Sequence, residues 1–178
     1  MKTLSSGVLV LSILFGSVTS AQQFKSDVSK KGTTAASFLS ISQGARAAGM
    51  GSAFVAVADD WSAMYWNPAG IASTTNGVTF DHTQWFADIG YNFVAGSVNL
   101  GSIGALGMSL TSSTIGDMKV TTVDAPEGTG EVFNMSQVAF SVAYAIQLTD
   151  NFAIGFNPKF VYERIWKMSA NAMATHAA

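Results

Sequence analysis

Two pairs of neighbouring side chains in this sequence have the composition needed for acid–base or metal chemistry. Asp59 and Asp60 stand side by side, and His82 follows Asp81. No third carboxylate or histidine stands near the aspartate pair at a spacing typical of metal ligands, so a helix cap explains that pair better. No serine nucleophile motif or second histidine completes a site around His82. The sequence therefore predicts no catalytic residue and no metal site.

A glycine cluster and an aromatic cluster are the remaining groups with possible ligand chemistry. Residues 44–51 contain glycines separated by four residues and then by one, but they lack the Lys-Ser or Lys-Thr pair of a phosphate-binding loop. Trp61, Tyr65 and Trp66 lie close together in the sequence. Such a cluster favours core packing over ligand stacking. We therefore expect no cofactor.

The overall composition is unlike that of an ordinary soluble domain. Of the 178 residues, 48% are hydrophobic and only 11% are charged, whereas soluble domains usually contain about 25% charged residues. High hydrophobicity with low charge also excludes intrinsic disorder. The formal net charge of −2 offers no basic surface for a phosphate backbone, so we expect no nucleic-acid partner. The absence of cysteine excludes disulfides and thiolate metal sites.

The amino terminus has the layout of a secretory signal peptide. Lys2 supplies a positive charge, residues 7–15 form a mainly apolar core, and small residues follow. This core is shorter than the roughly 20 residues of a membrane-spanning helix, and no long apolar run occurs later in the sequence. We expect residues 1–21 to be the signal peptide, with cleavage after Ser20 or Ala21 and export from the cytoplasm.

Residues 22–75 form the second expected region, which begins with a polar arm and becomes rich in alanine and glycine. A short helix is expected over residues 61–66, because the carboxylate of Asp59 or Asp60 can accept the free backbone donors of its first turn. Pro68 should end this helix, since the residue before a proline is biased away from helical geometry. A second short helical piece should follow.

From residue 77 onward the hydrophobic period changes to two, which is typical of β-strands. Large apolar side chains alternate with small or polar ones over residues 136–148, and residues 152–166 repeat the pattern, interrupted at Pro158 and Arg164. The tight turn between them predicts a hairpin. Three earlier strands with weaker alternation bring the expected number to about five. They are expected over residues 78–86, 91–100 and 103–111.

Four features favour a membrane barrel over a soluble β-sandwich. The expected strands are longer than the five or six residues typical of globular proteins, and about 9 to 11 residues cross a bilayer when tilted. The face opposite the large residues is mostly Ala, Gly, Ser and Gln, which suits a filled lumen. Residues 113–135 are polar, as in a long extracellular loop, with a strand extension expected near residues 118–123. Aromatic residues also fall near strand ends, namely Trp85, Phe86, Tyr91, Tyr162 and Trp166.

About five strands are too few to close a barrel, because bacterial barrels have about eight or more. Their two edges would leave backbone groups without partners in hydrocarbon. Residues 173–178 also lack the terminal aromatic residue that is usual in outer-membrane strands. We therefore expect an all-β fold, a transmembrane antiparallel β-barrel of which residues 76–178 supply the first strands. The chain is expected to be the amino-terminal part of a longer protein.

Residues 44–51, the Ala-Asp-Asp run that ends at Asp60, and the Tyr-Trp-Asn-Pro-Ala-Gly run of residues 65–70 form a motif. It resembles the amino-terminal signature of PorV/PorQ-like outer-membrane proteins of the type IX secretion system of Bacteroidetes. That family is similar in turn to the long-chain fatty-acid transporter barrels. The resemblance covers roughly residues 38–73. The motif residues are Gly44, Arg46, Gly49, Met50, Gly51, Asp59, Asp60, Tyr65, Trp66, Asn67, Pro68 and Gly70.

The resemblance implies that residues 22–75 form a plug-like segment within or beneath the barrel lumen. Gly49 and Gly51 are expected to allow close backbone approach there. It also implies residence in the outer membrane, with lipid, secreted cargo proteins and secretion-system components as partners. The barrel would act as a cargo shuttle or translocon component rather than as an enzyme. Two alternatives remain open at this point, a transporter of hydrophobic small molecules and a secreted β-sandwich or adhesin module.

Overall fold

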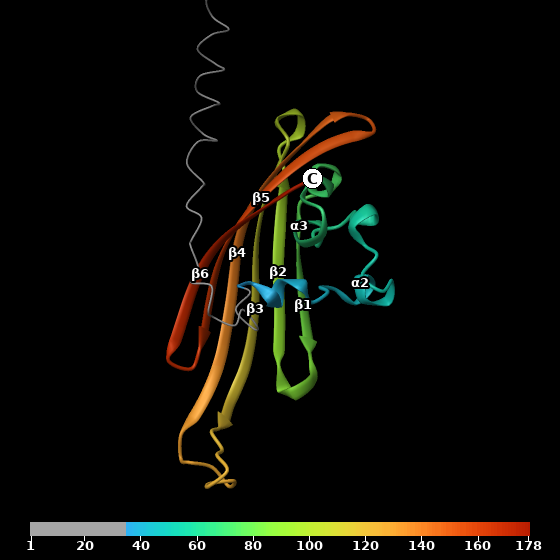
Figure 1. Cartoon of the computed structure of the whole chain (residues 1–178). Helices are drawn as coiled ribbons and strands as arrows, with labels where there is room; N and C mark the ends of the chain where they lie inside the picture. The colour runs from blue at the N-terminus through green and yellow to red at the C-terminus, as the bar shows by residue number, and fades with distance from the viewer. Residues whose placement is uncertain (1–34) are drawn as a thin grey trace, which may run out of the picture. The chain divides into compact units, whose positions relative to one another are not determined.

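The computed structural model describes residues 35–178, and the expected signal peptide lies outside these described residues. Six antiparallel strands form one sheet in which each strand pairs with its neighbour in sequence (Figure 1). The strands are β1 (Gly77–Gln84), β2 (Gly90–Asn99), β3 (Ala105–Lys119), β4 (Val132–Thr149), β5 (Phe152–Ile165) and β6 (Met168–Ala177).

Short helices precede the sheet and lie against one of its faces, which we call the inner face. Residues in these helices and in the strands behind them are fully buried, among them Met64 and Ile71. The helices are η1 (Ser37–Ser40), α2 (Ala45–Gly49), η2 (Val55–Val57), α3 (Ala63–Trp66) and η3 (Pro68–Ser73), with η4 (Phe86–Asp88) and η5 (Gly101–Ile103) in strand connections. Among the described helices, none has the length and apolar character needed to cross a bilayer.

The alternation expected for residues 136–148 is confirmed. Ala139 and Ala143 of β4 are buried on the inner face, whereas Phe140, Val142 and Tyr144 are 41%, 39% and 40% exposed on the other. We call this second face the outer face. The strand register aligns its apolar residues in rows that run across the sheet. One such row is Phe80, Val94, Leu110, Phe140, Phe160 and Met173.

The expected all-β fold with long antiparallel strands is confirmed, but the expected number of about five strands is too low. β6 is the additional strand, and it pairs with β5 over ten residues from Met168 to Ala177. Its sequence contains four alanines and no large residue besides methionine, so its alternation is too weak to detect. Trp166 adopts a left-handed backbone with φ of 53° and lies in the turn rather than in β5.

Eleven of the 23 residues in the polar stretch 113–135 lie in strands, and the remaining twelve form the loop. β3 continues to Lys119 and β4 begins at Val132, with a register shift between Ile115 and Met118. Figure 1 shows both strands reaching beyond their neighbours. The remaining connection, residues 120–131, is closed by backbone hydrogen bonds. The polar composition therefore marks a protruding hairpin and its loop.

The short hairpin connections agree with the sequence more closely. Asp150 and Asn151 alone join β4 to β5, as expected. Gly104 closes the connection between β2 and β3 with φ of 112°, and its carbonyl accepts a hydrogen bond of 2.7 Å from the backbone N–H of Leu100. Only glycine adopts such a φ without strain. The two short connections share one end of the sheet, and the long hairpin lies at the other.

Candidate functional site

The short helices between residues 37 and 73, which we call the helical segment, pack against three glycines of the inner face. Gly77 of β1, Gly107 of β3 and Gly155 of β5 each lack a side chain where the segment passes. A Cβ at Gly107 would lie 2.5 Å from the sulfur of Met64, and one at Gly155 would collide with the backbone of Ala69. Gly155 therefore lets the backbone of η3 approach the strand, whereas Gly77 and Gly107 leave room for the side chains of Trp61 and Met64.

Hydrogen bonds fix the same segment to the sheet. Asn157 Nδ2 on β5 donates to the carbonyl of Met64 at 2.6 Å, and Asn99 Nδ2 at the end of β2 donates to the carbonyl of Ala72 at 3.1 Å. The hydroxyls of Thr74 and Ser97 are 3.1 Å apart. Because Asn157 and Ser97 are buried, these bonds satisfy polar groups away from water. Residues 63–74 are thus tied to two distant strands.

An aromatic cluster fills the space beside α3. Tyr65 makes edge contacts with Trp66 and Phe93, with ring centroids 5.4 and 5.8 Å apart, and Phe54 packs on Trp66 at 6.0 Å. Lys159 Nζ on β5 lies 5.2 Å from the Tyr65 centroid. The expectation of core packing is confirmed for Tyr65 and Trp66.

Tyr65 also holds the first part of the described chain in place. Its hydroxyl donates to the carbonyls of Leu39 and Ile41. Burial raises the pKa of Tyr65 to about 12, although a hydrogen bond with Tyr91 opposes the shift. The hydroxyl is therefore a permanent donor at neutral pH. Trp66 Nε1 adds a bond of 3.1 Å to the carbonyl of Gln43.

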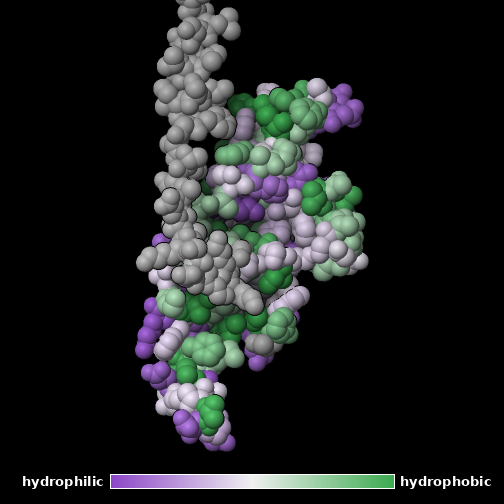
Figure 2. Space-filling view, in the orientation of Figure 1, coloured by the Kyte–Doolittle hydropathy of each residue, from purple (hydrophilic) through white to green (hydrophobic). Residues whose placement is uncertain are grey.

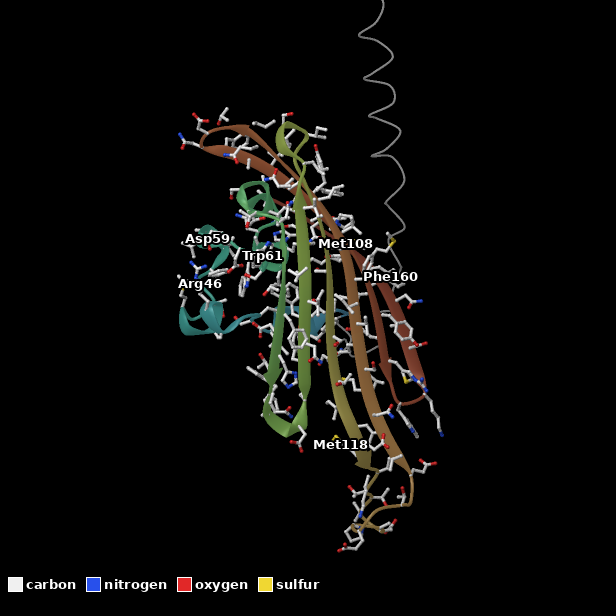
Figure 3. The ribbon with its side chains drawn as sticks, turned by 180° about the vertical axis from the view of Figure 1, so that it is seen from behind. Arg46, Asp59, Trp61, Met108, Met118 and Phe160 are labelled. Atoms are coloured by element: carbon white, nitrogen blue, oxygen red, sulfur yellow. The ribbon has the colours of Figure 1, made fainter. Side chains whose placement is uncertain are left out.

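The two adjacent aspartates have different roles. The carboxylate of Asp60 accepts a hydrogen bond of 2.8 Å from the backbone N–H of Ser62, which precedes α3. Asp59 instead pairs with Arg46, whose Nη1 lies 2.6 Å from Asp59 Oδ1 (Figure 3). The hydrogen bond from Arg46 lowers the pKa of Asp59 below its ordinary value of 3.8. The expected helix over residues 61–66 is shorter, because α3 begins at Ala63, and its N-cap, Ser62, makes no side-chain capping bond. Asp60 closes the turn before α3 instead of capping it and lies 3.4 Å from Arg46 Nη1, while Asp59 forms the shorter, exposed ion pair.

Asn67, Pro68 and Gly70 shape the turn between α3 and η3. The side-chain oxygen of Asn67 accepts from the backbone N–H of Ala69 at 3.1 Å, and its amide donates to the carbonyl of Val55 at 3.1 Å. Pro68 is the first residue of η3, where its missing N–H is not needed. A Cβ at Gly70 would collide with the carbonyl of Ala58. These residues join η3 to the loop that precedes α3.

The remaining motif residues lie around α2, next to β1 (Figure 1). Gly44 and Gly51 have φ of 89° and 61°. The expected close backbone approach at Gly49 and Gly51 is wrong, because no described atom lies within 4 Å of a Cβ placed at either residue. Gly51 is explained by its left-handed φ, and nothing in the structure explains Gly49. Met50 is 44% exposed, and apolar side chains reach the surface in this region (Figure 2).

The described residues contain no grouping suited to acid–base or metal chemistry. Asp81 and His82 alternate between the two faces of β1, and His82 Nδ1 lies 2.7 Å from Asn92 Oδ1. No cluster of three potential metal ligands occurs in the described part of the chain. The site is therefore an interface that holds the helical segment on the sheet.

Sequence reasoning missed the sheet side of this interface. Gly107 and Gly155 interrupt strand patterns, and a glycine within a strand often marks a close backbone approach. That signal was present in the sequence. The contact between Asn157 and Met64 joins residues 93 positions apart, and no local pattern predicts such a pairing.

Comparison with known proteins identifies the family. A family model described as type IX secretion system protein PorV matches residues 24–178. The match includes the helical segment and all six strands. No curated protein and no solved structure gave a significant match. The similarity to fatty-acid transporters stays a prediction, whereas the match over most of the sequence places this chain in the PorV family of type IX secretion system proteins.

Proposed function

We propose that this sheet is part of an outer-membrane β-barrel that serves protein export and surface delivery by the type IX route, as a cargo shuttle or translocon component. The family match supports the pathway. The apolar outer face supports the membrane location. Nothing in the geometry favours catalysis, and neither alternative from the sequence has comparable support.

The outer face is the observation that carries this proposal. Along β4 the outward positions from Val138 to Leu148 are all apolar, and β5 repeats this from Phe152 to Phe160 except at Pro158. The run on β4 covers eleven residues, which matches the roughly 9 to 11 residues of a tilted membrane strand. An apolar surface of this extent needs a covering of lipid or protein.

We propose that residues 22–75 act as a plug within the lumen and that residues 76–178 form the wall. The interlocking of the helical segment with the wall glycines supports this division for the described part, residues 35–75. Export through a signal peptide over residues 1–21 is part of the same proposal. Outer-membrane lipid, secreted cargo and other secretion components are the partners we propose.

The loop of residues 120–131 is the part that we propose contacts a protein partner outside the membrane. It carries three carboxylates, those of Asp124, Glu127 and Glu131, and no lysine or arginine. Val123 is 99% exposed. Hydrogen bonds within the loop, such as that from the backbone N–H of Thr129 to the carbonyl of Val120 at 2.8 Å, give it a defined conformation. A partner can therefore bind it without first ordering it.

Fractionation of cells producing the protein tests the proposal. The protein should sediment with outer membranes, resist extraction by high salt, and migrate faster on a gel before heating than after. A barrel keeps its strand pairing in cold detergent, which explains the mobility shift. Extraction by salt alone would contradict the proposal and would favour a secreted β-sandwich.

A further inference from the structure

The carboxyl end of β5 lies at the same end of the sheet as the loop of residues 120–131, and it carries a positive charge on the outer face. β4 contains no charged residue, and β6 contains only His176 as a titratable group. On β5 the side chains of Lys159 and Glu163 lie half-buried on the inner face, whereas Arg164 is exposed on the outer face. Arg164 is therefore the only outward charge on the three strands, and it needs a physical explanation.

A second cation lies in the turn that follows. Lys167 Nζ is 4.5 Å from the ring centroid of Trp166, and Arg164 Nε donates to the carbonyl of Trp166 at 3.4 Å. Trp166 is 40% exposed. The left-handed backbone at Trp166 tightens the turn. Both cations therefore contact one residue, Lys167 at its exposed indole and Arg164 at its backbone carbonyl.

The row of the sheet that contains Arg164 is polar. Arg164 pairs with Ser136 on β4 and with Ser169 on β6, and Ser136 pairs with Thr114 on β3. The apolar row that includes Phe160, labelled in Figure 3, lies four residues away along β5. The basic group therefore lies where the apolar face gives way to polar residues. In a membrane strand this border is the depth of the lipid headgroups.

The guanidinium of Arg164 is available to a ligand. Its terminal nitrogens form no hydrogen bond or ion pair with the described residues. The carboxylate of Asp117 accepts from Asn134 Nδ2 at 3.0 Å and forms no salt bridge with Arg164. A free guanidinium can hold two oxygens of one phosphate, and a neighbouring ammonium adds a further charge.

We propose that Arg164, Trp166 and Lys167 bind the phosphorylated headgroup of a lipid in the external leaflet of the outer membrane. The two cations contact the phosphate, the serine hydroxyls lie beside them, and the indole lies at the boundary with the acyl chains. This inference rests on the proposed function, since it places the long-loop end of the sheet outside the cell.

Binding of a labelled lipid to the full-length protein in bilayers tests the site. The bilayer is phosphatidylcholine, and the probe is bisphosphorylated lipid A, with dephosphorylated lipid A and inorganic phosphate as comparisons. The test variants are Arg164→Gln, Lys167→Gln and the pair together. Lys119→Gln is the matched control, because it removes an exposed cation at the end of β3 instead. Gel mobility before heating shows whether each variant is inserted.

We expect each single substitution to weaken binding of the phosphorylated lipid about fivefold and the pair to weaken it more strongly, because each cation near an anionic lipid contributes separately. The control should bind like the unchanged protein. Equal binding of both lipids, competition by inorganic phosphate at lipid concentrations, or no effect of the double substitution would overturn the site while leaving the barrel intact. Failure of the unchanged protein to insert would overturn the proposed function and the site together.

Discussion

Single atoms decide how the helical segment is held, and Gly155 is the clearest case. Its φ is outside the left-handed region, so the glycine is required for space and not for conformation. The backbone of Pro68 and Ala69 occupies the position of the missing side chain. Backbone atoms cannot rotate aside as a side chain can. A methyl group at this position must therefore push η3 away from the sheet.

We predict that Gly155→Ala lowers the free energy of unfolding by about 1 to 3 kcal/mol, the usual cost of overpacking a close contact. Gly116→Ala is the matched control, because no described atom lies within 4 Å of its added Cβ and its φ is ordinary. Urea unfolding of the full-length protein in detergent measures both. A loss no greater than that of the control would contradict the close contact between Gly155 and η3.

The ion pair between Arg46 and Asp59 predicts that the stability of residues 45–57 depends on pH. Because the pKa of Asp59 is lowered in the folded chain, its contribution is complete above the ordinary pKa and is lost as the pH falls through the lowered value. Hydrogen exchange of residues 45–57 should therefore accelerate in acid at low salt, beyond the intrinsic change in exchange rate.

Asp59→Asn provides the comparison for this measurement, since it removes the charge and keeps the size. In this variant the amides of residues 45–57 should exchange faster at pH 7 than in the unchanged protein. Their exchange should also lose the additional acid dependence. Both groups are exposed, so salt should weaken the effect in the unchanged protein. An acid response that persists in Asp59→Asn would assign the dependence to another group.

Individual strands were predictable to the extent that large side chains mark their faces. β4 and β5 combine bulky outward residues with inward residues that are mostly small or polar, and their common hairpin was expected correctly. β6 contains mainly alanine, serine and methionine, so no pattern distinguishes its faces. The ends of β3 and β4 were predicted only in part, as a strand extension near residues 118–123, because a hairpin that protrudes beyond the sheet has no buried face to create alternation. The contacts at Gly77, Gly107 and Gly155 join segments that are distant in the sequence.

The depth of each outward position along β4 predicts how much an arginine costs there. Phe140→Arg should cost about 2 to 4 kcal/mol because it places a charge near the middle of the bilayer, whereas Ser136→Arg should cost about 0 to 1 kcal/mol near the interface. Both residues are on the outer face of one strand. Reversible unfolding from phospholipid vesicles measures the difference. Equal costs at both positions would contradict the assigned membrane depth.

The inner face of the same strand must respond for a different reason. Ala143 is fully buried against the helical segment, so Ala143→Arg should displace that segment and not fail through contact with lipid. Its defect should therefore persist in detergent, where Phe140→Arg is tolerated. The pair of variants separates the two faces of β4.

The loop of residues 120–131 predicts a functional defect without a folding defect. Replacing residues 121–130 by a Gly-Ser sequence of equal length should leave the unheated gel mobility unchanged, because the strands on either side retain their pairing. Release of cargo to the cell surface should fall. A matched replacement of Asp150 and Asn151, at the opposite end of the sheet, should leave release unchanged. Normal release from the loop variant would move the partner surface elsewhere.

The sheet as a whole has two free edges, β1 and β6, among the described strands. Their unpaired backbone groups are costly in hydrocarbon, where each costs several kcal/mol. In the proposed barrel these two edges would therefore have to be paired. The α2 region lies next to β1 (Figure 1) and exposes Met50, Val55 and Val57, which an adjoining part of the wall would cover.

The neighbour-to-neighbour order of the strands also determines when the parts can assemble. Hairpins close short loops and form rapidly, whereas contacts between distant residues must wait for the chain between them. Met64 can contact Asn157 only after the four strands that lie between them in the sequence have paired. We therefore predict that pulse-labelled amides of β4 and β5 become protected before those of α3 and η3. Until that docking, Met64 and Ile71 remain uncovered, so this interval is when the chain most needs a chaperone.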